Sequence, residues 1–528
     1  MPRKPFTSSP LPRLLLASTL ASACVAGCRP TPVRSFDRAP VAMPESFGAA
    51  AALLEDAADD PRSGDAPAAM PEPWWRTFGD PGLDAAVDSA LAGNLELRQA
   101  WHRLRQAAAE VVISGAAAAP SLDASVSASG TRLGDREPEF PPDGSPGNRW
   151  DERYALGLGL SWELDVWGRL AAREQAATLR ARATRADVSD AALLVTAGVV
   201  EAWFTVQEQR AFLNLLEDQL QSSRTLLELT ELRFSLGEGS SVAVLQQRSQ
   251  VAATESQLPA AEARLAAARH RLAVLLGRTP DDLGPHEPGA VLPELPPLPP
   301  LAAPADLLRR RPDIRAAVAR LEATDREVAE AVADRWPRLS LSLTADWTTA
   351  AIGAAFQRDL VTAAAGVLLP LADGGRRTAE VRRREAIVQR QLDALGGVVL
   401  VALQEVEDAL SRERHQRELL RRRARQLALS RETLEETRRR YANGLGDYID
   451  VIVSLQSLQQ LERQVLGEEV ELLVNRSRLH RAFGGLWMEQ LDPAAPRDLD
   501  AFASAADRAP APDIVPESTP ESTPESLP

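Results

Sequence analysis

The sequence contains one unit twice, and this duplication constrains the possible folds more than any other feature. The segment from Leu95 to Leu122 matches the segment from Pro312 to Leu339 at an offset of 217 residues, and later positions match at an offset of 207. Two repeats, 74–279 and 305–487, therefore make up the body of the chain. The proline-rich segment 280–304 between them is predicted to be an extended linker.

Each repeat carries apolar residues at seven-residue intervals on two successive arms. A seven-residue period keeps one stripe of a helix against a partner helix, so each repeat is predicted to form a long antiparallel helical hairpin. The outward arm from Gly375 to Tyr441 would be on the order of 100 Å long at about 1.5 Å per residue. The aligned positions are Leu213, Leu220, Leu227 and Phe234 with Leu420, Leu427, Leu434 and Tyr441, and on the return arms Val251, Leu258, Leu265 and Leu272 with Leu458, Val465, Leu472 and Leu479.

A second pattern in each repeat has period two. Apolar residues alternate with small or polar ones from Tyr154 to Trp162 and from Leu339 to Trp347, and more weakly from Leu122 to Gly130 and from Thr362 to Leu371. These segments predict one strand hairpin per repeat, with strands of about the 9–11 residues that cross an outer membrane. The alternation by itself also fits the core of a soluble sandwich.

Four such strands are too few to close a barrel. An open edge in lipid leaves backbone groups unpaired at a cost of several kcal/mol each, so the chain is predicted to assemble with copies of itself. Two chains would give eight strands around a lumen filled by side chains, whereas three would give twelve strands around an open lumen. We therefore predict a homotrimer.

The N-terminus carries a targeting signal. Basic residues precede an apolar run that ends in small residues before Cys28, which predicts a signal peptide at 1–27 and a lipid anchor on Cys28. The alternative is ordinary cleavage without lipid. Residues 28–73 are predicted to be a tether with little regular structure, and 488–528 a disordered tail. No run of 18 apolar residues follows the signal, so we expect no transmembrane helix in the mature chain.

Composition argues against several function classes. The net charge of −14 disfavours a nucleic-acid partner. Lys4 is the only lysine, which excludes a P-loop, and Cys24 and Cys28 are the only cysteines, which excludes a thiolate metal site in the body. The five histidines show no metal-ligand spacing. We therefore expect no catalytic site, no metal and no cofactor other than lipid on Cys28.

Several motifs together resemble the TolC/OprM family of outer-membrane efflux ducts, in its lipoprotein, NodT-like branch. They are Trp74–Leu83, Ser161–Arg169 and Arg309–Ile314, in the context of the repeats and the cysteine that follows the signal. The resemblance covers 74–487. It implies an α+β membrane protein whose trimer forms a twelve-stranded barrel in outer-membrane lipid, with a periplasmic helical tunnel and a small mixed equatorial region.

The same resemblance implies a function and partners. The chain would be the passive outer-membrane exit duct of a tripartite efflux system, taking small molecules from an inner-membrane pump of the resistance-nodulation-division type through a periplasmic adaptor. Two alternatives remain: the outer-membrane duct of a type I protein secretion system, and a lipid-anchored coiled-coil spacer without a pore.

The resemblance also suggests site residues. The hairpin tips would dock the adaptor, with a pure turn role as the rival interpretation, and three glycines would permit the bend between barrel and tunnel unless they are ordinary loop glycines. The tip residues are Arg233, Phe234, Gly237, Gly239, Arg440, Tyr441, Gly444 and Gly446, and the junction glycines are Gly168, Gly374 and Gly375.

One predicted site departs from the family pattern. Family members often carry an aspartate twelve residues after the tyrosine of the second tip, where this chain has Val453. We hypothesise that Val453 forms an apolar ring that closes the periplasmic end by dewetting, with Asp447 and Asp450 giving cation preference at the mouth. Packing between helices is the alternative role for Val453.

Overall fold

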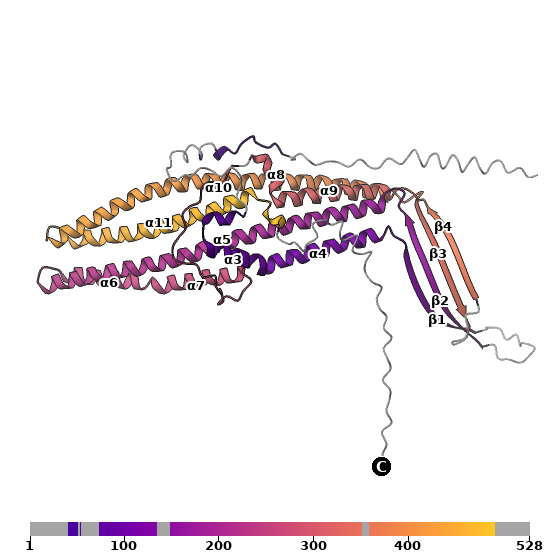
Figure 1. The fold of residues 1–528 in the computed structure, drawn as a ribbon, viewed down its shortest axis with the longest axis horizontal. Coiled ribbons are helices and arrows are strands. Elements are labelled where there is room, and N and C mark those ends of the chain that lie inside the picture. The colour runs from indigo at the N-terminus through magenta and orange to yellow at the C-terminus, as the bar shows by residue number, and fades with distance from the viewer. Residues whose placement is uncertain are drawn as a thin grey trace, which may run out of the picture.

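The computed structural model of the chain is an elongated molecule, with two helical hairpins at one end and a sheet at the other (Figure 1). The signal peptide, Cys28, much of the tether and the tail beyond 490 lie outside the described residues. The residues that the structure describes are 41–50, 53, 73–134, 148–301, 303–350 and 358–490.

The sheet has four antiparallel strands in chain order. They are β1 (Ser121–Gly134), β2 (Asn148–Leu164), β3 (Arg338–Thr349) and β4 (Arg358–Leu368). The sheet therefore contains one strand hairpin from each repeat, as predicted. The alternation predicted that the fourth strand ends at Leu371. β4 ends earlier, because Pro370 has no N–H to donate to a ladder of hydrogen bonds.

The strand register separates the sheet into two chemically different faces. Leu156 pairs with Val126 on one side and Trp347 on the other, whereas the next residue, Gly157, pairs with Ser125 and Asp346. Because neighbouring residues point to opposite faces, one face is apolar and the other is small and polar. A barrel built from this sheet would expose the first face to lipid and the second to its lumen.

Four helices below the sheet follow the same order as the strands. α4 (Leu95–Ala116) precedes β1, α5 (Arg169–Ser235) follows β2, α9 (Pro312–Ala333) precedes β3 and α10 (Arg376–Ala442) follows β4. α4 packs on α5, α5 on α9, and α9 on α10. The four helices therefore form one layer that continues the sheet, with α4 and α10 at its edges.

The long hairpins extend from this layer. α5 and α10 each have 67 residues, or roughly 100 Å at 1.5 Å per residue. α10 returns through the continuous α11 (Tyr448–Phe483), whereas α5 returns through α6 (Ser241–Glu255) and α7 (Leu258–Leu275). The first return arm is interrupted because Pro259 cannot donate the N–H that a continuous helix requires.

The predicted heptad stripe holds in the second hairpin and shifts in the first. Leu434 and Tyr441 are buried in the seam, as expected. Phe234 is instead 48% exposed, and the buried stripe of α5 passes through Leu226 and Thr230. Phe234 therefore lies outside the contact that its counterpart Tyr441 makes.

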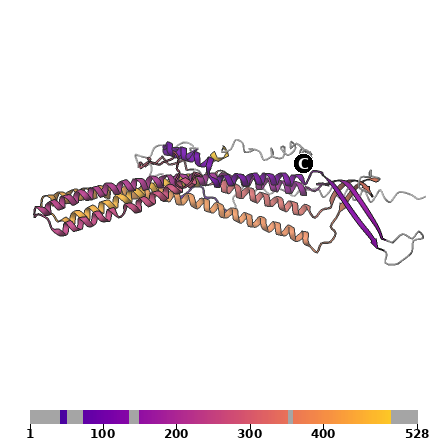
Figure 2. The same ribbon diagram turned by 90° about the horizontal axis from the view of Figure 1, so that it is seen from below.

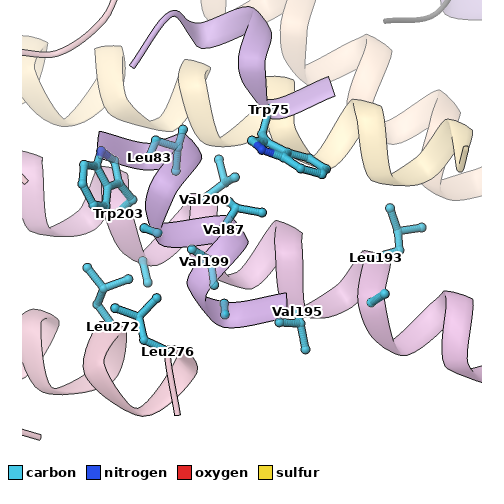
Figure 3. Packing of buried hydrophobic residues seen from close by; sticks show 14 of the residues in the cluster. Trp75, Leu83, Val87, Leu193, Val195, Val199, Val200, Trp203, Leu272 and Leu276 are labelled. Carbon is cyan, nitrogen blue, oxygen red and sulfur yellow. The ribbon is translucent and has the colours of Figure 1, made fainter. Parts of the chain in front are cut away.

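A mixed region surrounds the middle of the helices. The short helix η1 (Trp74–Phe78) and α3 (Pro81–Gly93) pack on α5, where Leu83 and Val87 meet Val199, Val200 and Trp203 (Figure 3). Asp80 caps α3 by accepting from the N–H of Gly82 at 2.9 Å, and its other carboxylate oxygen accepts from the Trp203 indole at 2.8 Å. The Trp74–Leu83 motif is thus a packing unit for the long helix.

The proline-rich linker is extended, but it is packed against this region. Leu283 and Leu298 are buried in separate cores, and the fully buried Arg476 of α11 donates to the Pro296 carbonyl. Arg476 is also paired with buried Glu413 of α10 at 2.5 Å. Beyond the linker, η2 (Pro304–Asp306) and α8 (Leu307–Arg310) begin the second repeat, and η3 (Trp487–Gln490) ends it with three residues of the predicted tail.

The described part of the N-terminal tether is docked on the second repeat, a contact that the prediction of little regular structure did not include. Phe47 and Leu53 are buried in the core of the second repeat, and the Phe47 ring lies 6.2 Å from that of Phe483. The N–H groups of Gly48 and Ala49 donate to the Glu407 carboxylate at 2.6 and 3.0 Å. Composition gave no sign of this contact because the partners lie more than 300 residues away.

α5 and α10 are long and apolar enough to cross a membrane by length and composition only, so the expectation of no transmembrane helix stays a prediction. An 18-residue window of α5 has a mean hydropathy of 1.3, and one of α10 has a mean hydropathy of 1.5. Both windows include interspersed polar residues. The α5 window is 67% buried, so it belongs to the core, whereas the α10 window is only 28% buried. The edge helix therefore has an uncovered apolar side, with Leu400 and Val401 each 54% exposed.

The docked tether leads to a first prediction. Phe47→Ala should release the segment, because truncating a buried phenylalanine costs about 3–5 kcal/mol. Amide exchange of the peptide containing Gly48 and Ala49 should then accelerate at least about 100-fold by mass spectrometry. Phe234→Ala, at an exposed tip, is the control and should leave this peptide protected; equal protection in both variants would contradict the docked arrangement.

Candidate functional site

The three junction glycines lie where strands pass into helices. Gly168, Gly374 and Gly375 have φ of 72°, 62° and 86°, a left-handed conformation that favours glycine. Beside the first junction, the Trp167 ring stacks on Trp336 at 5.3 Å, and its indole N–H donates to the Pro337 carbonyl at 2.7 Å. The bend between sheet and helices is therefore set by backbone conformation and held by a contact between the two repeats.

The two hairpin tips share one construction. Gly237 and Gly444 have φ of 80° and 71° and make the reversal. Gly239 and Gly446 are needed for space instead, since a Cβ there would lie 3.0 Å from the Phe234 nitrogen and 3.2 Å from the Arg440 Cβ. Only the first glycine of each tip therefore adopts the left-handed conformation.

The tips present apolar side chains without partners in the described protomer. At the first tip, Phe234, Leu236 and Leu245 are 48–65% exposed, and at the second tip Leu445 and Ile449 are 71% and 51% exposed. Apolar groups clustered at the end of a molecule are typical of a protein interaction surface.

Arg233 and Tyr441, which were predicted at the docking surface, lie between the two hairpins. The Arg233 guanidinium sits 4.5 Å from the centre of the Tyr441 ring and donates to the Tyr441 carbonyl. Tyr441 is only 7% exposed, so an adaptor could not contact it directly. These residues join the tips, and the exposed side chains around them form the outer surface.

A polar network that the sequence did not reveal continues this connection along the hairpins. Tyr448 donates its hydroxyl to Gln247, and Gln247 donates to the Ser223 carbonyl at 2.6 Å. Gln219 and Gln459 each donate to the other's backbone carbonyl at 3.1 and 3.3 Å. Burial raises the pKa of the Tyr448 hydroxyl, which keeps it protonated as a donor. The sequence does carry one signal for this network, namely polar residues that interrupt an apolar stripe of a helix.

The predicted gate residues begin α11. Asp447 is its N-cap residue and Asp450 lies in its first turn. Val453 is 54% exposed, whereas the buried stripe of this helix runs through Val451 and Leu455. Val453 therefore does not pack between helices within the described protomer, and its role at a gate stays a prediction.

The wall of the helical layer contains a groove of about 670 Å³ between α4, α5 and α9. Asp187 on its rim pairs with Arg320 at 2.5 Å. Asp190, one turn further along α5, lines the groove without an ion-pair partner in the described ranges. Burial raises the pKa of Asp190 to about 6, with a smaller contribution from Asp313 that Arg311 opposes.

No group of three or more metal-ligating side chains occurs within the described residues. The one histidine in the deep core is His480, which stacks on Trp74 with ring centres 5.2 Å apart. Burial, and to a smaller extent the positive charge of Arg476, lowers the pKa of His480 to about 3, so the imidazole stays neutral. Its environment is that of a packed aromatic residue.

Comparison with known proteins decides the family. The profile of the family described as "Outer membrane efflux protein" matches residues 86–278 and 303–485, once in each repeat. The chain belongs to the outer membrane efflux protein family. This family consists of outer-membrane channels and is not an enzyme family, and membership places the chain in the outer membrane.

Individual members of the outer membrane efflux protein family are similar to this chain over most of its length. The pyoverdine export outer membrane protein OpmQ of Pseudomonas putida is 28% identical, covering 90% of this chain and 98% of OpmQ. Outer membrane protein OprJ of Pseudomonas aeruginosa is also 28% identical, covering 90% and 95%. The solved outer-membrane channel OprN shares the fold with a TM-score of 0.75 at 29% identity, covering 85% of this chain and 98% of OprN.

The raised pKa of Asp190 predicts a pH-dependent stability. Above about pH 6 the folded state must hold a desolvated carboxylate, so this group lowers stability as pH rises from about 4 through 6. Asp190→Asn should therefore raise the free energy of unfolding by about 1–2 kcal/mol at pH 8 and by much less at pH 4.5. Thermal denaturation at the two pH values measures this. Asp218→Asn, at an exposed site, should show no such difference; an equal gain at both pH values would contradict the assignment.

Proposed function

We propose that this chain is the trimeric exit duct of a tripartite efflux system, passing small molecules across the outer membrane without catalytic chemistry. The observation that carries the proposal is the shared order of strands and helices. The sheet ends at β1 and β4 and the helical layer at α4 and α10, on the same two sides. Joining three chains side by side would close the barrel and the tunnel with the same set of contacts.

The energetics favour this closure. β1 and β4 each pair on one side only within the described chain, and each unpaired backbone group in lipid costs several kcal/mol. The exposed Leu400 and Val401 of the edge helix α10 would gain cover from a neighbouring chain. Twelve strands enclose a lumen, and the face that would line it carries small and polar residues such as Ser125, Gly157 and Asp346.

The partners follow from the ends of the molecule. The exposed apolar residues of both tips support docking of a periplasmic adaptor protein, which would connect the duct to an inner-membrane pump of the resistance-nodulation-division type. The names of relatives refer to export of pyoverdine and to efflux of solvents and toluene. These cargoes support small molecules over polypeptides as the substrates of this chain.

The lipid anchor fits this placement. Twelve residues lie between Cys28 and Val41, where the docked segment begins, so this stretch can span at most about 45 Å. The docked Phe47 shares a core with Ile314, which lies near the start of α9. The 22 residues of α9 rise about 33 Å from there to the level of the sheet. A lipid on Cys28 could therefore reach the inner leaflet while Phe47 stays docked.

Three observations test the proposal together. We expect the protein in outer-membrane fractions as a trimer that dissociates on heating, we expect single-channel currents from the purified protein in planar bilayers, and we expect hypersensitivity to drugs or solvents on deletion of its gene. A monomer without conductance would instead identify a spacer. A secreted polypeptide that disappears on deletion, with unchanged drug sensitivity, would identify a secretion duct.

The gate hypothesis has its own test. Three copies of Val453 would form an apolar ring at the periplasmic end, and Val453→Ala should widen and wet it, raising the closed-state current severalfold. Asp450→Asn should reduce cation preference. Val242→Ala, an exposed valine at the first tip, is the control for the ring. Unchanged current and selectivity in Val453→Ala would remove Val453 from the gate.

A further inference from the structure

The groove between α4, α5 and α9 opens on the side of the helical layer away from the equatorial region. α3 packs on Val199, Val200 and Trp203 and so covers one side of α5. α3 therefore lies on one side of the helical layer (Figure 2). Asp187 and Leu194, which line the groove, occupy the other side of α5. In the proposed trimer that side faces the lumen.

The groove is lined by three arginines and three carboxylates, which differ in how they are paired and buried. Arg320 is paired with Asp187, and Arg180 is paired with Glu327, which also pairs with Arg384. Arg103 and Glu110 lie exposed on α4 with opposite charges. Asp190 is partly buried and has no ion-pair partner within the parts of the chain that the structure covers.

Nearby arginines do not satisfy Asp190. Arg311 and Arg481 lie close enough to lower its pKa, but both have other partners. Arg311 is bound to Asp313 at 2.8 Å, to Glu405 at 2.7 Å and to the Ala482 carbonyl at 3.0 Å, and Arg481 is paired with Glu405 at 3.5 Å. A partly buried carboxylate that lacks its own counter-ion gains most from an added cation, because desolvation strengthens the pairing.

The remaining lining consists of small apolar side chains, Leu194 and the polar Gln106 and Thr184. Ala100, Ala107, Ala177 and Ala191 leave the space between the helices open, and Leu194 is 48% exposed at one end. A volume of about 670 Å³ is in the range of sites that hold drug-sized molecules. The groove thus combines small apolar side chains with a partly buried carboxylate that has no ion pair within the described residues.

We propose that this groove is a transient binding site for amphipathic organic cations in transit through the duct. The cationic nitrogen would pair with the Asp190 carboxylate, and the apolar body would lie against the alanines and Leu194. The lumenal position of the site rests on the proposed function, whereas the binding chemistry depends only on residues of one chain.

Rhodamine 6G, a fluorescent organic cation, and fluorescein, an anion with a related ring system, test this site by fluorescence anisotropy on the purified full-length protein in detergent. Wild type should bind rhodamine 6G in preference to fluorescein, and Asp190→Asn should weaken rhodamine 6G binding about tenfold through loss of the charge-assisted contact. Asp218→Asn removes the same charge from an exposed site of α5 and should leave the affinity unchanged.

Each outcome decides the inference. Equal affinities in wild type and Asp190→Asn, or equal losses in Asp190→Asn and Asp218→Asn, would overturn it. A trimer that conducts but binds rhodamine 6G independently of Asp190 would leave the proposed function standing and remove only the binding site. Protein that neither forms trimers nor conducts would refute the proposed function, while the dependence of dye binding on Asp190 would still be measured.

Discussion

Backbone hydrogen bonding at the edges of the sheet is the constraint on which the rest of the structure depends. β1 and β4 have one paired side each, and lipid offers no partner for the other. The helices repeat the order of the strands, so the open edges of the sheet lie above the open edges of the helical layer. An assembly that satisfies the backbone in the membrane therefore also closes the tunnel below it.

The equatorial contacts make this continuity possible. Asp80 binds both the N-terminus of α3 and the Trp203 indole, and Arg476 joins α10, α11 and the linker through Glu413 and Pro296. Such buried polar groups are costly unless each has a partner, so they fix the relative positions of segments that apolar packing alone would leave free to slide. The rigid middle leaves the tips and the sheet as the functional ends.

Sequence reasoning succeeded where structure depends on neighbouring residues. The seven-residue stripe predicted both hairpins, and the two-residue alternation predicted all four strands, because each period records which side of the element carries apolar residues. It failed at positions whose partners lie far along the chain. Tyr441 was expected on the docking surface but is covered by Arg233, and the docking of Phe47 on Phe483 was not predicted for the tether.

The sequence by itself determined the repeat, the lengths of the arms, the two faces of the sheet and the family. Tertiary structure alone decided that Gln219 meets Gln459, that Asp190 lines a groove without an ion-pair partner among the described residues, and that α10 has an uncovered apolar side. The physical reason is range: periodicity is a local property of the chain, whereas burial and pairing of a polar side chain depend on which distant segment the fold brings beside it.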